Sequence, residues 1–104
     1  MSKAPCIAIV GATGAVGREI LTVLSQRDFP LGNLRLLASR RSMGTVISFR
    51  GTTYTVEKLG EESFDGVDIV FFSAGASISQ RYAPIAVSHG CLVVDNSSAF
   101  RMNI

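Results

Sequence analysis

The stretch Ile7-Ala-Ile-Val-Gly-Ala-Thr-Gly-Ala-Val-Gly17 decides the fold. Its first four residues are apolar and end at a glycine, which is typical of a short strand buried on both faces of a parallel sheet. Apolar residues then recur at helical spacing, at Val16, Ile20, Val23 and Leu24. The stretch therefore predicts a strand that is followed directly by a helix.

The segments that follow extend this unit. Asp28-Phe-Pro30 ends the helix, because proline biases the residue before it away from helix. The apolar run Leu34–Ala38 predicts a parallel strand, which completes a βαβ unit. Thr45–Phe49 and Thr52–Val56 alternate around Arg50-Gly51, which predicts a hairpin with a two-residue turn at the edge of the sheet.

The second half of the chain repeats the alternation of strand and helix. Val67–Phe72 and Cys91–Asp95 predict two more buried strands, and Ser77–Ser88 has helical character although it contains Pro84. Gly90 ends that helix. We therefore expect one α/β domain over residues 1–104, a Rossmann-like, doubly wound and mainly parallel sheet with an edge hairpin.

Three glycines with the spacing G-x-x-G-x-x-G lie between the first strand and its helix. Gly11 permits a sharp turn, Gly14 leaves room for a pyrophosphate against the backbone, and Gly17 permits close packing of helix on strand. Backbone amides and the positive end of the helix dipole supply donors and charge, and Thr13 adds a hydroxyl. The alternative is a purely structural turn. A P-loop is excluded because no Gly-Lys-Ser/Thr follows.

The end of the second predicted strand indicates which dinucleotide binds. Domains that bind NAD place a carboxylate there for the ribose 2′-hydroxyl, whereas this chain has Ser39, Arg40, Arg41 and Ser42. Guanidinium groups and hydroxyls suit a 2′-phosphate, so the sequence favours NADP over NAD, with Arg41 and Ser42 as the preferred pair. The alternative for the two arginines is a pair of solvated loop cations.

Composition excludes several other classes. The 104 residues carry a net charge of +2 without a long basic run, which gives little support for nucleic-acid binding. No apolar stretch approaches the roughly 18 residues that span a bilayer, and no signal peptide is evident, so a cytoplasmic protein is expected. Cys6 and Cys91 lie in apolar runs and are expected in the core; with one histidine, no metal site is expected.

The chain resembles the N-terminal region of bacterial-type aspartate-semialdehyde dehydrogenases. Four motifs in the right order carry the resemblance, which extends from about Ile7 to Met102: Gly11-Ala-Thr-Gly-Ala-Val-Gly17, Leu37-Ala-Ser-Arg-Arg-Ser-Met-Gly44, Phe72-Ser-Ala-Gly75 and Asp95-Asn-Ser-Ser-Ala-Phe-Arg-Met102. The resemblance implies reductive dephosphorylation of aspartyl phosphate by NADPH, through an enzyme-bound thioester, to aspartate semialdehyde and phosphate. This reaction belongs to the biosynthesis of lysine, threonine and methionine.

The resemblance also assigns roles to residues of this chain. The turn from Thr13 through Ala15 and Val16 would hold the pyrophosphate, Arg41 and Ser42 would meet the adenosine end, and Ser73, Ala74 and Gly75 would line the cofactor groove. Arg101 would grip the substrate phosphate, and Asn96 and Ser97 follow the fourth strand, where open α/β sheets place ligands.

The resemblance places the nucleophilic cysteine and the histidine base beyond this chain, so no catalytic residue is expected within it. Cys6 and Cys91 are expected in buried strands and cannot replace the nucleophile, and His89 is expected to be a capping or surface residue. We expect a fragment of a larger two-domain enzyme, a homodimer or homotetramer, that binds cofactor without turnover when isolated.

Two other interpretations remain. N-acetylglutamyl-phosphate reductase shares the chemistry and domain plan, although the motifs around Ser39–Ser42 and Asn96–Arg101 favour the aspartate enzyme. A non-catalytic NADP-sensing module would also suit a chain of 104 residues. A reading frame that continues with a cysteine in a short polar motif and later a histidine would exclude the sensor.

Overall fold

The fold is a parallel sheet with helices on both faces, seen in a computed structural model that describes residues 4–28 and 30–95. The elements in chain order are β1 (Cys6–Val10), α1 (Ala15–Gln26), β2 (Asn33–Ala38), the 3₁₀ turn η1 (Arg40–Ser42), β3 (Val46–Phe49), β4 (Thr52–Thr55), β5 (Glu57–Lys58), η2 (Glu61–Phe64), β6 (Ile69–Phe72), α2 (Ala76–Ser88) and β7 (Leu92–Asp95).

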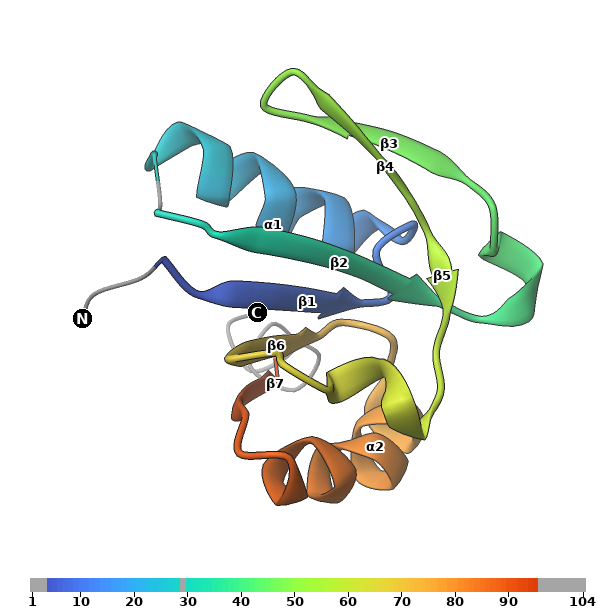
Figure 1. Ribbon diagram of the computed structural model, residues 1–104. Coiled ribbons are helices and arrows are strands. Elements are labelled where there is room, and N and C mark those ends of the chain that lie inside the picture. The colour runs from blue at the N-terminus through green and yellow to red at the C-terminus, as the bar shows by residue number, and fades with distance from the viewer. Residues whose placement is uncertain (1–3, 29, 96–104) are drawn as a thin grey trace, which may run out of the picture.

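The main sheet has the strand order β5-β2-β1-β6-β7, and every pairing in it is parallel. Figure 1 shows α1 on one face together with the β3–β4 hairpin, and α2 on the opposite face. The chain leaves β1 toward β2 on one side and later returns toward β6 and β7 on the other. This reversal confirms the predicted doubly wound sheet and places a crevice at the carboxyl ends of the strands.

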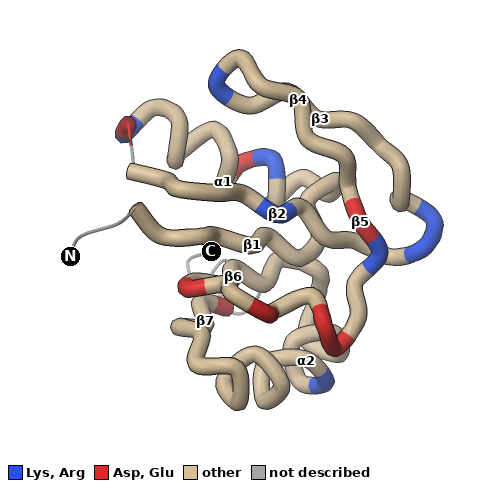
Figure 2. The backbone as a smooth tube through the Cα atoms, in the orientation of Figure 1, with Lys and Arg blue, Asp and Glu red and all other residues tan. Residues whose placement is uncertain are grey.

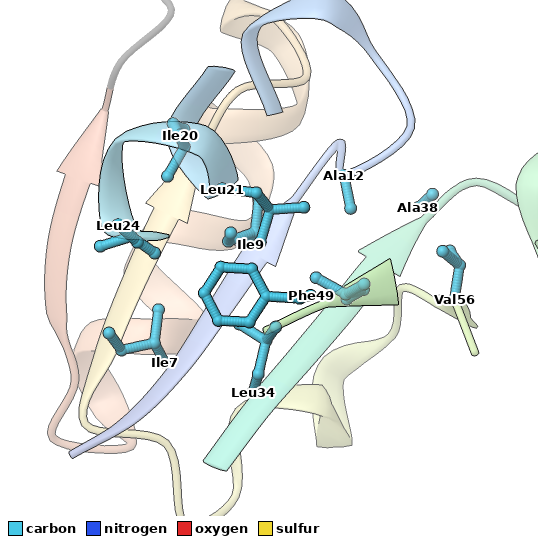
Figure 3. Packing of buried hydrophobic residues seen from close by; sticks show 11 residues of the cluster. Ile7, Ile9, Ala12, Ile20, Leu21, Leu24, Leu34, Ala38, Phe49 and Val56 are labelled. Atoms are coloured by element: carbon cyan, nitrogen blue, oxygen red, sulfur yellow. The ribbon is translucent and has the colours of Figure 1, made fainter. Parts of the chain in front are cut away.

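Alternating side chains of the central strands build two cores. On β1, Ile7 and Ile9 contribute to the core under α1, whereas Ala8 and Val10 contribute to the core under α2. Figure 3 shows the first core, in which Phe49 of the hairpin packs beside residues of α1. Burial on both faces explains why these strands read as continuous apolar runs.

The hairpin has the predicted turn and an unexpected position. Arg50 and Gly51 both have positive φ, 54° and 80°, as a two-residue turn of type I′ requires. The hairpin forms a two-stranded sheet of its own rather than extending the main one. The strand at that edge is β5, two residues long, which sequence reasoning did not predict because two residues show no periodicity.

The remaining elements follow the predictions with small differences. The helix α2 continues through Pro84, so packing on the sheet outweighs the backbone hydrogen bond that proline removes. Gly90, with φ of 83°, ends it as predicted. Cys91 is buried in the core under α2, as predicted, although it lies one residue before β7; the prediction was wrong for Cys6, which begins β1 and is only half-buried.

Candidate dinucleotide-binding site

A groove of about 400 Å³ opens at the carboxyl ends of β1, β2 and β6. Its walls come from the three turns that leave these strands, so segments far apart in sequence meet there. Its lining includes seven residues that were predicted from the sequence to contact the cofactor: Gly11, Thr13, Gly14, Ser39, Ser42, Ser73 and Ala74. The structure therefore brings the three predicted segments to one site.

The structure gives a different reason for glycine at each of the three positions of the turn. Gly11 has φ of 88°, and its N–H donates to the carbonyl oxygen of Leu37 at 2.7 Å, which bends the chain sharply off β1. A Cβ on Gly17 would overlap the backbone of Gly11 and Ala12, so this glycine permits close packing of α1 on the turn. Among the described residues, a Cβ on Gly14 would have one neighbour within 4 Å, the carbonyl oxygen of Gly11 at 3.5 Å. The fold leaves the space at Gly14 open, as a pyrophosphate would require.

The N-terminus of α1 is available to an anion. Gly14 is its N-cap residue, no side chain among residues 4–28 and 30–95 caps it, and its first turn contains no acidic residue. The first backbone bond of the helix runs from Arg18 N–H to Gly14 O at 3.0 Å. The amides of Ala15, Val16 and Gly17 precede that bond and lack an intrahelical acceptor, and the helix dipole adds partial positive charge.

A hydrogen bond joins the glycine turn to the turn after β2. The Thr13 hydroxyl donates to the Ser42 hydroxyl at 3.0 Å, 29 positions later in the chain. Ser39 also lines the groove, whereas Arg40 and Arg41 are exposed in η1 beside it. The arginines thus flank the groove, which suits a phosphate at its rim.

The third wall follows β6. The Ser73 hydroxyl donates to the carbonyl oxygen of Val10 at 2.7 Å, which fixes this turn against the first. Ala74 lines the groove, and Gly75, with φ of 106°, is the N-cap residue of α2. A Cβ on Gly11 would lie 3.0 Å from Ala74, so the two turns are in close contact.

The groove also has apolar walls, which the sequence did not predict. Leu59, directly after β5, and Ile78, in the first turn of α2, are both half-buried and line it. Both side chains are apolar, which suits contact with a flat ring. Leu59 could have been found only by placing the two-residue β5 beside β2. The predicted substrate residues Asn96, Ser97 and Arg101 lie outside the described residues.

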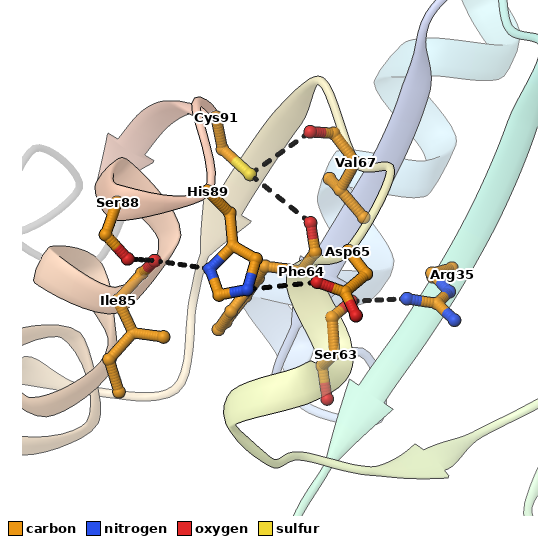
Figure 4. A network of polar contacts seen from close by, with 9 residues as sticks. All are labelled: Arg35, Ser63, Phe64, Asp65, Val67, Ile85, Ser88, His89 and Cys91. Carbon is orange, nitrogen blue, oxygen red and sulfur yellow. Dashed lines mark hydrogen bonds and ion pairs between the residues drawn. The ribbon is translucent and has the colours of Figure 1, made fainter.

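His89 and Cys91 lie at the C-terminal end of α2, away from the groove (Figure 4). His89 is the C-cap residue of α2, in agreement with its expected capping or surface role, with Nδ1 2.9 Å from Ile85 O and Nε2 3.0 Å from Asp65 Oδ1. The Cys91 thiol donates to Val67 O at 3.1 Å, and burial raises its pKa above the ordinary value. Over residues 4–28 and 30–95, no three His, Cys, Asp or Glu side chains gather as metal ligands.

Fold and groove together define a dinucleotide-binding α/β domain: a parallel sheet, a glycine turn with open space at Gly14, and the bare N-terminus of α1. The sequence profile described as "Semialdehyde dehydrogenase, NAD binding domain" matches residues 6–104. The chain belongs to this family, and its cofactor class is a nicotinamide dinucleotide.

Comparison with individual proteins agrees with this family assignment. The aspartate-semialdehyde dehydrogenase of Bacillus subtilis (strain 168) is 50% identical over 103 residues, which are 99% of this chain and 30% of the relative. That of Aquifex aeolicus (strain VF5) is 54% identical over 98 residues, 93% of this chain and 29% of the relative. Aspartate semialdehyde dehydrogenase II from Vibrio cholerae, solved in complex with ASA, superimposes with a TM-score of 0.86 at 45% identity, over 89% of this chain and 30% of that one.

This chain therefore spans about 30% of the length of the curated relatives reported above. In its described part, no helix is both long and apolar enough to cross a membrane.

Proposed function

We propose that this chain is the NADP-binding part of an aspartate-semialdehyde dehydrogenase. The observation that carries the proposal is the groove, where the open space at Gly14 and the bare N-terminus of α1 meet the turn that contains Arg41. The identity of about 50% to aspartate-semialdehyde dehydrogenases supports the choice of enzyme.

Each part of the groove has a role in this proposal. The pyrophosphate would meet the amides at the start of α1 together with the Thr13 hydroxyl, with Gly14 leaving room for it. Ser39, Arg41 and Ser42 would hold the adenosine end, and the turn Ser73–Gly75 would border the nicotinamide end. When bound, the cofactor would supply the hydride for reduction.

NADP is proposed over NAD for an electrostatic reason. The residues that follow β2 are Ser39 and then the exposed pair Arg40 and Arg41, and no carboxylate stands among them to accept from a ribose 2′-hydroxyl. A guanidinium group donates two parallel hydrogen bonds to a phosphate and keeps its charge at all physiological pH values.

The whole protein would convert aspartyl phosphate to aspartate semialdehyde and phosphate. We propose that it is a cytoplasmic homodimer or homotetramer, that its nucleophilic cysteine and histidine base lie outside this chain, and that Asn96, Ser97 and Arg101 contribute to its substrate-phosphate site. Light scattering of the full-length protein tests the oligomeric state, and assays with aspartyl phosphate and N-acetylglutamyl phosphate test the substrate.

Titration of the purified chain with NADPH and with NADH by calorimetry tests the cofactor proposal. We expect NADPH to bind at least about tenfold more tightly, the ratio that corresponds to about 1.4 kcal/mol. Equal affinities would contradict the assignment of the 2′-phosphate to Arg41 and its neighbours. Absence of binding by either nucleotide would contradict the site itself.

A further inference from the structure

Lys58, the last residue of β5, lies beside the carboxyl end of β2. The two strands pair in parallel, so Lys58 is the register partner of Ala38. The N–H of Leu59 donates to the carbonyl oxygen of Ala38 at 2.8 Å and continues the ladder. Because Ser39 and Leu59 both line the groove, the backbone of Lys58 is held at the groove's rim.

The side chain of Lys58 starts on the same side of the sheet as the segment that follows η1. Ala38, the parallel register partner of Lys58, is 5% exposed in the core under α1, as is Val56 at 1%, so Lys58 starts on that side of the sheet and Glu57 on the other. Val56 also pairs with that segment: its N–H donates to Thr45 O at 2.7 Å, and its carbonyl oxygen accepts from Gly44 N–H at 2.9 Å. The end of β5 and the turn containing the arginines are thus adjacent.

This arrangement gathers three cations. Figure 2 shows the basic end of β5 near the basic turn after β2, and β5 and η1 are in contact. Lys58, Arg40 and Arg41 are all exposed. Within the part of the chain that the structure describes, none of the three has a carboxylate partner within ion-pair distance. A cluster of unneutralised cations at the adenosine end of a dinucleotide groove raises the local potential for an anion.

We propose that Lys58 is a specificity-determining residue, which together with Arg41 recognises the 2′-phosphate of NADP. The inference rests on the proposed function and adds to it a residue from a different strand. The Lys58 ammonium group is a point charge on a flexible side chain, so it would attract the 2′-phosphate without the fixed geometry of a guanidinium group.

Affinity measurements on matched variants test this inference. Lys58→Ala is expected to weaken NADP binding about tenfold, which is the scale of one charge interaction of about 1.4 kcal/mol, and to leave NAD binding unchanged. Lys58→Arg should keep most of the NADP affinity. The control is Arg27→Ala, which removes an exposed cation at the C-terminal end of α1, away from the groove, and should change neither affinity.

Salt provides a second readout. The difference in NADP affinity between wild type and Lys58→Ala should become smaller when NaCl is raised from about 0.05 M to about 0.5 M. The reason is that interactions between exposed charges are screened over a shorter distance at high ionic strength. If the wild type binds NADP and Lys58→Ala binds it equally well, or loses NADP and NAD to the same extent, the inference is wrong while the proposed function stands. If the wild type binds neither nucleotide, both are wrong.

Discussion

Gly14 and Gly17 offer a sharp test, because substitution by alanine should mainly reduce stability at Gly17 and mainly reduce cofactor binding at Gly14. A Cβ on Gly17 would lie 2.9 Å from Ala12 Cα and 3.0 Å from the carbonyl carbon of Gly11, and nearer still to that carbonyl oxygen. These are backbone atoms, which can move only if α1 shifts away from β1. The Cβ of an alanine at position 14 would meet a single atom at 3.5 Å, an ordinary contact.

The expected magnitudes follow from these distances. Overpacking of a tight site costs typically about 1–3 kcal/mol, and here the upper end applies because the neighbours are backbone. The higher helix propensity of alanine offsets about 1 kcal/mol at most. Gly17→Ala should therefore lower the free energy of unfolding by about 2 kcal/mol, or the Tm by about 8–16 °C. Gly14→Ala, at an N-cap with ordinary extended backbone, should lower it by less than about 1 kcal/mol.

The two variants should separate stability from binding. Urea denaturation measures the first and calorimetric titration with NADPH the second, and Gly14→Ala should lose at least about tenfold in affinity while remaining folded. Gly14→Val, whose side chain is larger, should abolish binding. A Gly14→Ala variant with wild-type affinity would refute the placement of the pyrophosphate, and a Gly17→Ala variant as stable as wild type would refute the packing argument.

Three further predictions concern other parts of the molecule. Arg41→Ala should weaken NADP by about 1–3 kcal/mol, the scale of a hydrogen bond to a charged group, with little effect on NAD; equal losses in titrations with both nucleotides would place the 2′-phosphate elsewhere. Burial raises the pKa of the Cys91 thiol above its ordinary value of 9.0, with a smaller contribution from a nearby carboxylate. The unfolded chain therefore loses this proton first as the pH rises past about 9, so the contribution of Cys91 to stability should fall from there upward. Denaturation at pH 8 and pH 10 checks this against Cys91→Ala, which should show less of the decline, and alkylation at pH 8 should be slow until urea is added. His89→Ala should lower the free energy of unfolding by about 1 kcal/mol or less, because it removes the contacts with Ile85 and Asp65 at the C-terminal end of α2; NADPH affinity should stay unchanged, since the groove lies at the other end of that helix.

Much of the fold was predictable because its signals are local. The burial of β1 and β2 on both faces is visible as apolar runs, α1 shows its helical spacing, and Gly90 marks the end of α2. The same holds for the hairpin turn at Arg50-Gly51. Each of these features depends on residues within one short window of sequence.

The site was predictable only in part, because it is assembled from segments that lie far apart in the sequence. The glycine spacing predicts a phosphate turn with Gly14 open and Gly17 packed, and the distances from these two positions to Gly11 and Ala12 agree with both assignments. The hydrogen bond from Thr13 to Ser42 joins residues 29 positions apart and leaves no trace in either motif.

The amino-acid sequence by itself therefore determined the alternation of strands and helices and the chemical character of the turns between them. The tertiary structure decided which of those turns meet. It formed the two-residue strand β5, whose existence depends on its pairing with β2, and so brought Leu59 to the groove and Lys58 beside Ala38 at its rim. The physical reason is that periodicity and turn preference are properties of a short segment, whereas strand pairing and atomic contact depend on residues that only folding brings together.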